Sequence, residues 1–381
     1  MSKTERKAKE LVFSFPHMGD YHVPIARLLE NMFPAGRVLV PPPITKKTIE
    51  LGSRYSPDFI CAPFKFNVGN YIEALEKGAN VLIQTGLGCR FGYFGEVQER
   101  ILQDLGYEFQ FFSLARENAK VKNAYQGFRR LGSPHSPAKF LSYVLIAAES
   151  IRIMDHFAFI MRERAGFALR PGSFEYLYGC MLEELRRVST LRELIAIRRQ
   201  YTDSFSKVEV RRPPGLLRVG IVGELYTLME PYSNLFIEKE LAKHNIMVSR
   251  KMSATFLLFG KNSRKSLKDT GKYMKYWPGA NATDSVAQSR HYGRLGYDGI
   301  IHMKSYGCTP EINAMPVLHN LGKDYNIPIL YLSFDGQTNE TGVQTRLEAF
   351  VDMLEMRRKT LEKDSLSRDG HRFHFDKGSR S

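Results

Sequence analysis

The sequence has few cysteines, no long hydrophobic run and no excess of negative charge. Its 381 residues include four cysteines, too few for a secreted domain stabilised by disulfides. No stretch approaches the roughly 20 apolar residues of a membrane-spanning helix. The N-terminal segment has no apolar core of the kind a signal peptide needs. We therefore expect a soluble cytoplasmic protein with reduced thiols and no membrane partner.

Positive charge is in excess and unevenly distributed. The chain has 55 Lys and Arg against 40 Asp and Glu, a formal net charge of +15, which favours an acidic partner. Residues 116–212 contain 18 basic and 10 acidic residues, so +8 of this charge falls in one segment. Two interpretations stay open: a solvated basic surface, or a surface for an anionic ligand or acidic protein. Because the sequence has no zinc-finger or RNP motif, we expect no nucleic-acid partner.

Hydrophobic periodicity predicts an α/β protein with two doubly wound, flavodoxin-like or Rossmann-like lobes and a helical insert between them. Hydrophobic residues make up 43% of the chain, enough for a large core. The expected parts are an N-terminal lobe over 8–115, a basic helical insert and linker over 116–212, a C-terminal lobe over 213–362 and a flexible tail over 363–381.

Short apolar runs bounded by turn residues are the expected strands. In the first lobe they are Leu11–Phe15, Arg37–Val40, Asp58–Ile60, Asn80–Gln84 and Phe109–Ser113. In the second lobe they are Leu217–Val222, Gly299–Met303 and Ile327–Ser333. Within the insert, apolar residues three and four apart predict long helices over Phe140–Arg164 and Phe174–Arg199.

Three of the four cysteines share one sequence context. Cys61, Cys89 and Cys308 each follow a predicted strand and precede a predicted helix. Ligands of doubly wound folds bind at the carboxyl ends of the strands, and a helix N-terminus favours the thiolate form of cysteine. If the two lobes face each other, these thiols converge in the cleft. Three thiolates suit an iron–sulfur cluster with one open iron, or zinc with a fourth ligand from elsewhere.

The cysteine spacing alone does not decide between a metal site and buried structural thiols. Cys61, Cys89 and Cys308 are separated by 28 and 219 residues, which matches no short ferredoxin or zinc-finger pattern. Three buried thiols that act as small hydrophobic residues are the alternative. Cys180 differs from the others because it lies inside an amphipathic helical pattern, and we assign it to packing.

Five short stretches carry a resemblance to a known family. They are Cys61–Lys65, Gly88–Tyr93, Arg218–Tyr226, Gly307–Glu311 and Asp335–Phe350. The most specific is the string Cys-Arg-Phe-Gly-Tyr that starts at Cys89. In this order the stretches resemble the iron–sulfur subunits of 2-hydroxyacyl-CoA dehydratases and benzoyl-CoA reductases, and above all the proteins called acyl-CoA dehydratase activase-related.

The resemblance implies a [4Fe-4S] cluster that Cys61, Cys89 and Cys308 hold, with a fourth position that is open or not filled by the protein. It also implies oxygen sensitivity and an ATP-dependent activase as the electron donor. In dehydratase members the electron passes to a CoA thioester, which is the candidate substrate here. The chain lacks the activase's own phosphate-binding and cysteine motifs. Both a homodimer and a heterodimer are compatible with the resemblance.

Charged residues near the predicted ligands each have two interpretations. Lys65 and Arg90 are either positive charges beside an anionic cluster or ordinary surface charges. Glu224 and Glu311 either carry protons or interact with a helix dipole. No role is assigned to the histidines of the lobe segments, which are His17, His22 and His302.

These observations lead to two main functional hypotheses and one weaker alternative. The first is an iron–sulfur redox subunit of the 2-hydroxyacyl-CoA dehydratase type, reduced by the activase and acting on a CoA thioester. The second is a non-catalytic iron–sulfur scaffold or electron carrier that partners the activase. The third is a two-lobed small-molecule binder without a metal.

Overall fold

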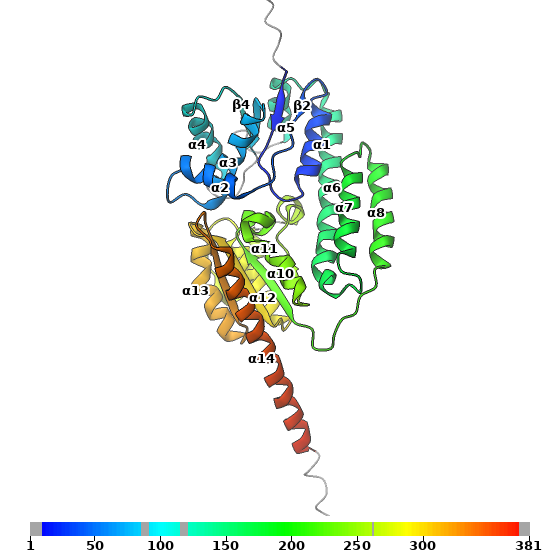
Figure 1. The fold of residues 1–381 in the computed structure, drawn as a ribbon, viewed down its shortest axis with the longest axis vertical. Helices are drawn as coiled ribbons and strands as arrows, with labels where there is room; N and C mark the ends of the chain where they lie inside the picture. Colours follow the sequence, from blue (N-terminus) through cyan, green and yellow to red (C-terminus); the bar gives the residue numbers. More distant parts are fainter. Residues whose placement is uncertain (1–9, 85–90, 115–120, 261–262, 373–381) are drawn as a thin grey trace, which may run out of the picture.

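The computed structural model describes residues 10–84, 91–114, 121–260 and 263–372. Two parallel sheets form the centres of two lobes, drawn one above the other in Figure 1. A group of helices, drawn in green, lies along one side of both lobes. The architecture confirms the predicted two-lobed α/β fold with helices inserted between the sheets in the sequence.

The first sheet has four parallel strands in the order β2-β1-β3-β4. Its strands are β1 (Val12–Ser14), β2 (Arg37–Val38), β3 (Val81–Gln84) and β4 (Gln110–Ser113). The helices of this lobe are α1 (His22–Met32), α2 (Lys46–Tyr55), α3 (Ala62–Glu76) and α4 (Phe91–Asp104). Two separate apolar cores, one with α1 and one with α3 and α4, bury residues of this sheet, as expected of a doubly wound sheet.

The second sheet repeats the same parallel order, β6-β5-β7-β8. Its strands are β5 (Arg218–Gly223), β6 (Met247–Arg250), β7 (Gly299–Ser305) and β8 (Ile329–Phe334). One core contains residues of α10 (Ile237–Lys243) and α14 (Glu340–Arg372), and another those of α12 (Ala282–Arg294) and α13 (Thr309–Asp324). Shorter helices connect these elements: α9 (Leu225–Met229), η2 (Pro231–Asn234), η3 (Phe256–Gly260), α11 (Ser263–Asp269) and η4 (Gly271–Tyr273).

Two strand assignments from the sequence need correction. The expected strand at Asp58–Ile60 is a turn, in which the Ile60 N–H donates to the Pro57 carbonyl over 3.3 Å. Its central residue, Phe59, is 94% exposed, and only Ile60 packs against the core of α3 and α4, so the segment forms no strand. Conversely, β6 was not predicted because its polar residues Ser249 and Arg250 interrupt the apolar pattern, although both are buried.

The insert consists of four α-helices in the described part of the chain. They are α5 (Val121–Arg130), α6 (Pro137–Arg164), α7 (Ser173–Leu185) and α8 (Leu191–Ser206), with the short helix η1 (Ala165–Phe167) after α6. The single helix expected over 174–199 is wrong, because Thr190 and Glu193 form a capping box that starts α8 as a new helix.

Ionic contacts inside the protein join the insert to the second lobe. Arg162 of α6 and Arg250 of β6 are both buried and flank Glu238 of α10. Arg250 Nε lies 2.5 Å from one Glu238 carboxylate oxygen, and Arg162 Nη1 lies 3.9 Å from the other. Apolar residues of the insert share a core with Tyr21 of the first lobe and Met229 of the second. The insert therefore packs against both lobes.

The two lobes also contact each other directly. Glu230 of the second lobe accepts the backbone N–H of Gly19 over 2.6 Å and lies 2.9 Å from His17 Nδ1. A methyl group at Gly19 would come within 2.7 Å of the Met229 carbonyl oxygen, and the positive φ of Gly19 also favours glycine. A small apolar cluster containing Ala62, Phe66 and Tyr226 extends this contact. The lobes are thus joined by polar and apolar contacts.

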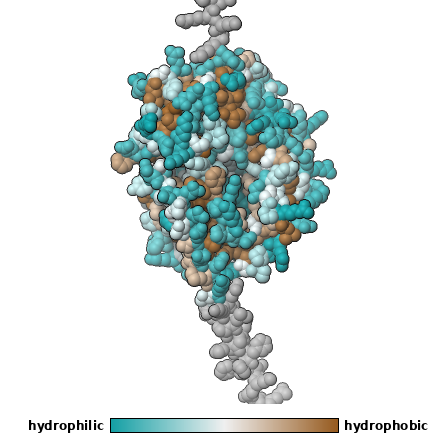
Figure 2. Space-filling view, viewed as in Figure 1, coloured by the Kyte–Doolittle hydropathy of each residue, from teal (hydrophilic) through white to brown (hydrophobic). Residues whose placement is uncertain are grey.

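Helix α14 continues to Arg372, beyond residue 363 where a flexible tail was expected. Figure 1 shows its C-terminal half projecting from the body of the molecule. No glycine or proline interrupts the sequence from Val343 to Asp369, which is compatible with a continuous helix. Across the described residues, no helix is both long and apolar enough to span a bilayer. The face in Figure 2 is mainly hydrophilic, with apolar residues in separate patches.

Candidate functional site

Cys61 is the N-cap residue of α3, in extended backbone conformation. Pro63 occupies the first turn of the helix, where a proline loses no intrahelical hydrogen bond. The helix predicted after Cys61 is therefore confirmed, whereas the strand predicted before it is the turn described above. Lys65 contributes to that turn, since its Nζ donates to the Asp58 carbonyl over 3.1 Å.

Cys308 is the N-cap residue of α13 and follows β7 directly after a short turn. Its N–H donates to the Ser305 carbonyl over 3.0 Å, and its own carbonyl accepts the N–H of Ile312 over 3.0 Å. Both the strand and the helix predicted around Cys308 are confirmed. The two cysteines thus occupy equivalent places, one at a helix N-terminus of each lobe.

The turns that carry Cys61 and Cys308 touch each other across the lobe boundary. The Ala62 N–H donates to the Ser305 hydroxyl oxygen over 2.8 Å, within a buried region. A methyl group added at Gly307 would lie 3.3 Å from the Phe59 carbonyl oxygen and 3.8 Å from the Cα of Cys61. The structure therefore brings together two of the three cysteines singled out in the sequence, although 247 positions separate their numbers.

The other two cysteines differ in status. Cys89 lies outside the described residues, as does Arg90, so the ligand role predicted for Cys89 stays a prediction. Cys180 lies in α7, is half-buried and packs against the core of the insert. Its assignment to packing is confirmed.

Two buried carboxylates, those of Glu224 and Glu311, interact electrostatically with the Cys308 thiol. Burial raises the pKa of Cys308, and the negative charges of Glu224 and Glu311 raise it further. Glu224 accepts the N–H groups of Tyr226 and Thr227 and the hydroxyl of Thr227 at distances of 2.7–2.9 Å. It therefore caps α9, the helix-terminus role considered for it in the sequence. Burial also raises the pKa of Glu224.

Glu311 belongs to a buried polar group that the sequence did not reveal. His302 Nε2 lies 2.8 Å from one Glu311 carboxylate oxygen, and Ser285 donates to the other over 3.1 Å. The His302 and Glu311 side chains are both almost inaccessible to solvent. Their sequence signal is weak, because His302 comes from a strand and Ser285 from α12. This group fixes the orientation of Glu311, three residues after Cys308.

Lys304 is a second residue missed by the sequence analysis. It lies in β7, is buried, and its Nζ donates to the Tyr306 carbonyl over 3.2 Å. Burial lowers the pKa of Lys304, while electrostatic interactions with Cys308 and Glu311 oppose that shift. A lysine at the end of an otherwise apolar strand was the available signal. Lys304 supplies positive charge close enough to interact with the Cys308 thiol.

The donor set around these thiols fits a cationic metal centre. A thiolate buried beside Glu224 and Glu311 is unfavourable by itself, but the charge of a bound metal reverses this balance. Within the described residues no three His, Cys, Asp or Glu side chains are arranged to hold a metal ion. The predicted third ligand, Cys89, is not among the residues searched. A metal site here therefore needs a donor in addition to Cys61 and Cys308.

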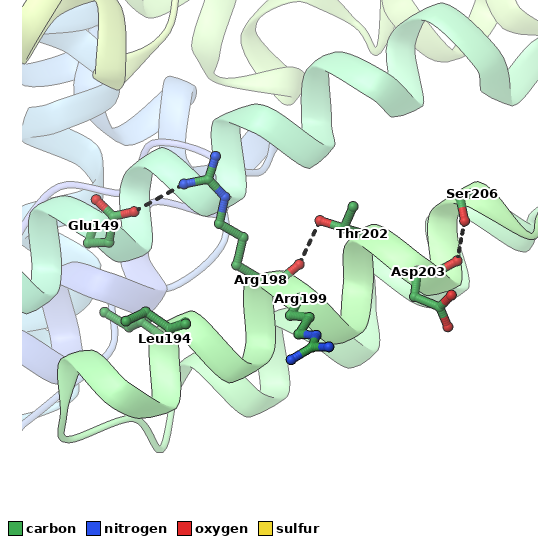
Figure 3. A pocket seen from close by; sticks show the side chains of 8 residues that line it. Glu149, Leu194, Arg198, Arg199, Thr202, Asp203 and Ser206 are labelled. Carbon is green, nitrogen blue, oxygen red and sulfur yellow. Dashed lines mark hydrogen bonds and ion pairs between the residues drawn. The ribbon is translucent and has the colours of Figure 1, made fainter.

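A groove of about 680 Å³ lies elsewhere, between α6 and α8 of the insert (Figure 3). Arg198 and Arg199 line it, together with the acidic residues Glu149 and Asp203. Arg198 Nη1 lies 3.7 Å from a Glu149 carboxylate oxygen. Because two acidic residues accompany the two arginines, the groove has little net charge. In Figure 1, α8 and α13 lie at opposite edges of the molecule, so this groove is distant from Cys308.

Comparison with known proteins gives a match to a family model over part of the second lobe. No curated protein matches the chain. Residues 268–354 match the family described as 2-hydroxyglutaryl-CoA dehydratase, D-component. The matched segment contains β7, Cys308, α13 and β8, which are the parts of the second lobe around Cys308. This match covers part of the second lobe and supports the resemblance to the 2-hydroxyacyl-CoA dehydratase superfamily.

Proposed function

We propose that the protein is an iron–sulfur redox component of the 2-hydroxyacyl-CoA dehydratase type. Cys61, Cys89 and Cys308 hold a [4Fe-4S] cluster in this proposal. The observation that carries it is the contact between the Cys61 and Cys308 turns, each at a helix N-terminus of a different lobe. When bound, such a cluster supplies one electron at a time and an open iron that acts as a Lewis acid.

The residues around the thiols have separate tasks in this proposal. The N-termini of α3 and α13 stabilise the two thiolates through their backbone N–H groups. Lys304 offsets negative charge at the end of β7. Glu311, oriented by His302 and Ser285, places a carboxyl group beside the site. Cys61 and Cys308 are both half-buried, and solvent access is one of the factors that set the potential of such a centre.

The proposed electron donor is an ATP-dependent activase, and we propose that it docks at two exposed aromatic residues beside the cysteines. Phe59 is 94% exposed and Tyr306 is 66% exposed, and each lies two residues before a cysteine of the pair. Aromatic residues are enriched in protein interfaces, whereas a folded chain seldom leaves phenylalanine fully solvated. The net charge of +15 would attract an acidic surface.

Anaerobic purification followed by iron and sulfide analysis tests the proposed cofactor. We expect a brown protein with about four irons and four acid-labile sulfides per chain, as in a cubane cluster. Stoichiometric zinc without sulfide would refute the cluster. A colourless, metal-free protein would instead favour a two-lobed small-molecule binder.

The catalytic and non-catalytic versions of the proposal differ in their response to substrate. If the protein acts on a CoA thioester, adding 2-hydroxyacyl-CoA to the reduced protein should change its electron paramagnetic resonance spectrum. A scaffold or electron carrier should be indifferent to every acyl-CoA tested, with free CoA as the matched control.

A further inference from the structure

Ser305 is a buried residue at the end of β7 that contacts both cysteine-bearing turns. Its hydroxyl oxygen accepts the Ala62 N–H over 2.8 Å, and Ala62 directly follows Cys61. Its carbonyl oxygen accepts the Cys308 N–H over 3.0 Å. Ser305 of the second lobe therefore hydrogen-bonds to the backbone of the residue after Cys61 and to the backbone of Cys308 itself.

The hydrogen bond to Ala62 has a defined structural role. Ala62 is the first residue of α3, and the N–H groups of a first helical turn have no partner within their own helix. Ser305 satisfies one of these groups from the opposite lobe, at a place where Ser305 itself is fully buried. Loss of the hydroxyl would leave a buried N–H without this partner, which weakens the contact between the turns.

Gly307 provides independent evidence that the spacing of the turns is narrowly set. A methyl group at Gly307 would lie 3.3 Å from the Phe59 carbonyl oxygen, closer than most side chains approach a neighbour. Glycine therefore allows the Cys308 turn to come close to the backbone before Cys61. The Ser305–Ala62 hydrogen bond and the close approach at Gly307 therefore both occur where the two cysteine turns meet.

From this geometry we propose that Ser305 is a positioning residue that sets the separation of the Cys61 and Cys308 thiols. It does so by tying the N-terminus of α3 to the turn that begins α13. The effect of Ser305 on cluster retention rests on the proposed function. Its effect on the spacing of the two thiols does not. Residues that orient metal ligands typically change metal affinity by about 10- to 100-fold when removed.

The first test measures thiol proximity without any metal. Metal-free protein with Cys89→Ser and Cys180→Ser is treated with dibromobimane, which becomes fluorescent when it bridges two nearby thiols. We expect Ser305→Ala to lower the bridged fraction several-fold, and Gly307→Ala to lower it as well. Ser289→Ala is the matched control, because Ser289 is a fully buried serine of α12 in the same lobe.

The second test uses the loaded protein with all four cysteines. Ser305→Ala should lose iron to a chelator about 10-fold faster than the wild type or Ser289→Ala, while circular dichroism shows the same helix content. Wild-type bridging together with wild-type iron loss in Ser305→Ala would overturn the positioning role. If the wild type binds no iron but Ser305→Ala still lowers bridging, the proposed cofactor fails and the positioning role stands.

Discussion

Cys308 occupies a place where a negative charge is unfavourable unless a cation accompanies it. Burial raises the pKa of its thiol, and Glu224 and Glu311 act in the same direction. A cysteine that works as a free nucleophile needs the opposite environment, with a lowered pKa and access to solvent. The proposed metal ligation is compatible with these observations, since a bound cation would favour the thiolate that burial disfavours.

Alanine substitutions separate the proposed ligands from the packing cysteine. Cys61→Ala and Cys308→Ala should each lose most of the bound iron, because each removes a thiolate from a set of three. Cys180→Ala should keep its iron and lower the free energy of unfolding by about 1 kcal/mol through a small cavity in the insert. Iron analysis and urea denaturation measure the two effects. Bleaching by Cys180→Ala alone would contradict the assignment.

The exposed aromatic residues beside the thiols should matter for a protein donor and not for a small one. Phe59→Ser combined with Tyr306→Ser should slow ATP-dependent reduction by the activase about tenfold or more, because interface aromatics carry much of the binding energy. Reduction by dithionite should be unchanged. Tyr176→Ser is the control, since Tyr176 is 72% exposed on α7 of the insert. Stopped-flow absorbance follows both reactions, and equal slowing with dithionite would indicate a damaged cluster.

At the scale of elements, the sequence predicts the local helix starts better than the contacts between lobes. The Cys-x-Pro pattern correctly indicates both helices, because proline in a first turn is a local signal. The strand before Cys61 was wrong, since Asp58, Phe59 and Ile60 form a turn between prolines and do not enter a sheet. The Ser305–Ala62 and Glu230–His17 contacts join residues 243 and 213 positions apart, and no local pattern encodes such a pairing.

The buried contact between α6, α10 and β6 gives a prediction about stability. Glu238→Gln removes the negative charge between Arg162 and Arg250, so two buried guanidinium groups would remain beside each other. The free energy of unfolding should fall by about 3 kcal/mol, as for a broken buried ion pair. Glu240→Gln on the same helix breaks only the pair with exposed Lys243 and should cost less than about 1 kcal/mol. Urea denaturation compares the two, and similar losses would show that burial is not decisive.

At the scale of the whole molecule, periodicity correctly predicted two parallel-sheet lobes with a helical insert between them in the sequence, but not the surface against which the insert packs. The sequence predicts that the basic helices lie between the lobes in chain order. In the structure α8 lies at the edge opposite α13 (Figure 1), and the insert packs along both lobes through α6. The order of the segments in the chain does not determine which side of the two lobes the insert covers, because an insert can pass the lobe boundary on either side. The charges of α8 therefore act on α13 only at long range, where salt screens them.

Because Cys61 and Cys308 come from different lobes, binding one metal centre should stabilise the contact between the lobes as a unit. Removing the metal should lower Tm by several degrees, since a ligand that binds only the closed form adds its binding free energy to folding. It should also increase hydrogen exchange at two separate places, Ala62 beside the thiols and Gly19, whose N–H bonds Glu230. Exchange measured by mass spectrometry on loaded and metal-free protein compares these sites, with Phe157 in the core of the insert as an unaffected reference. If only Ala62 responded, the metal would order the cysteine turns locally, because opening of the whole boundary must expose the Gly19 bond too.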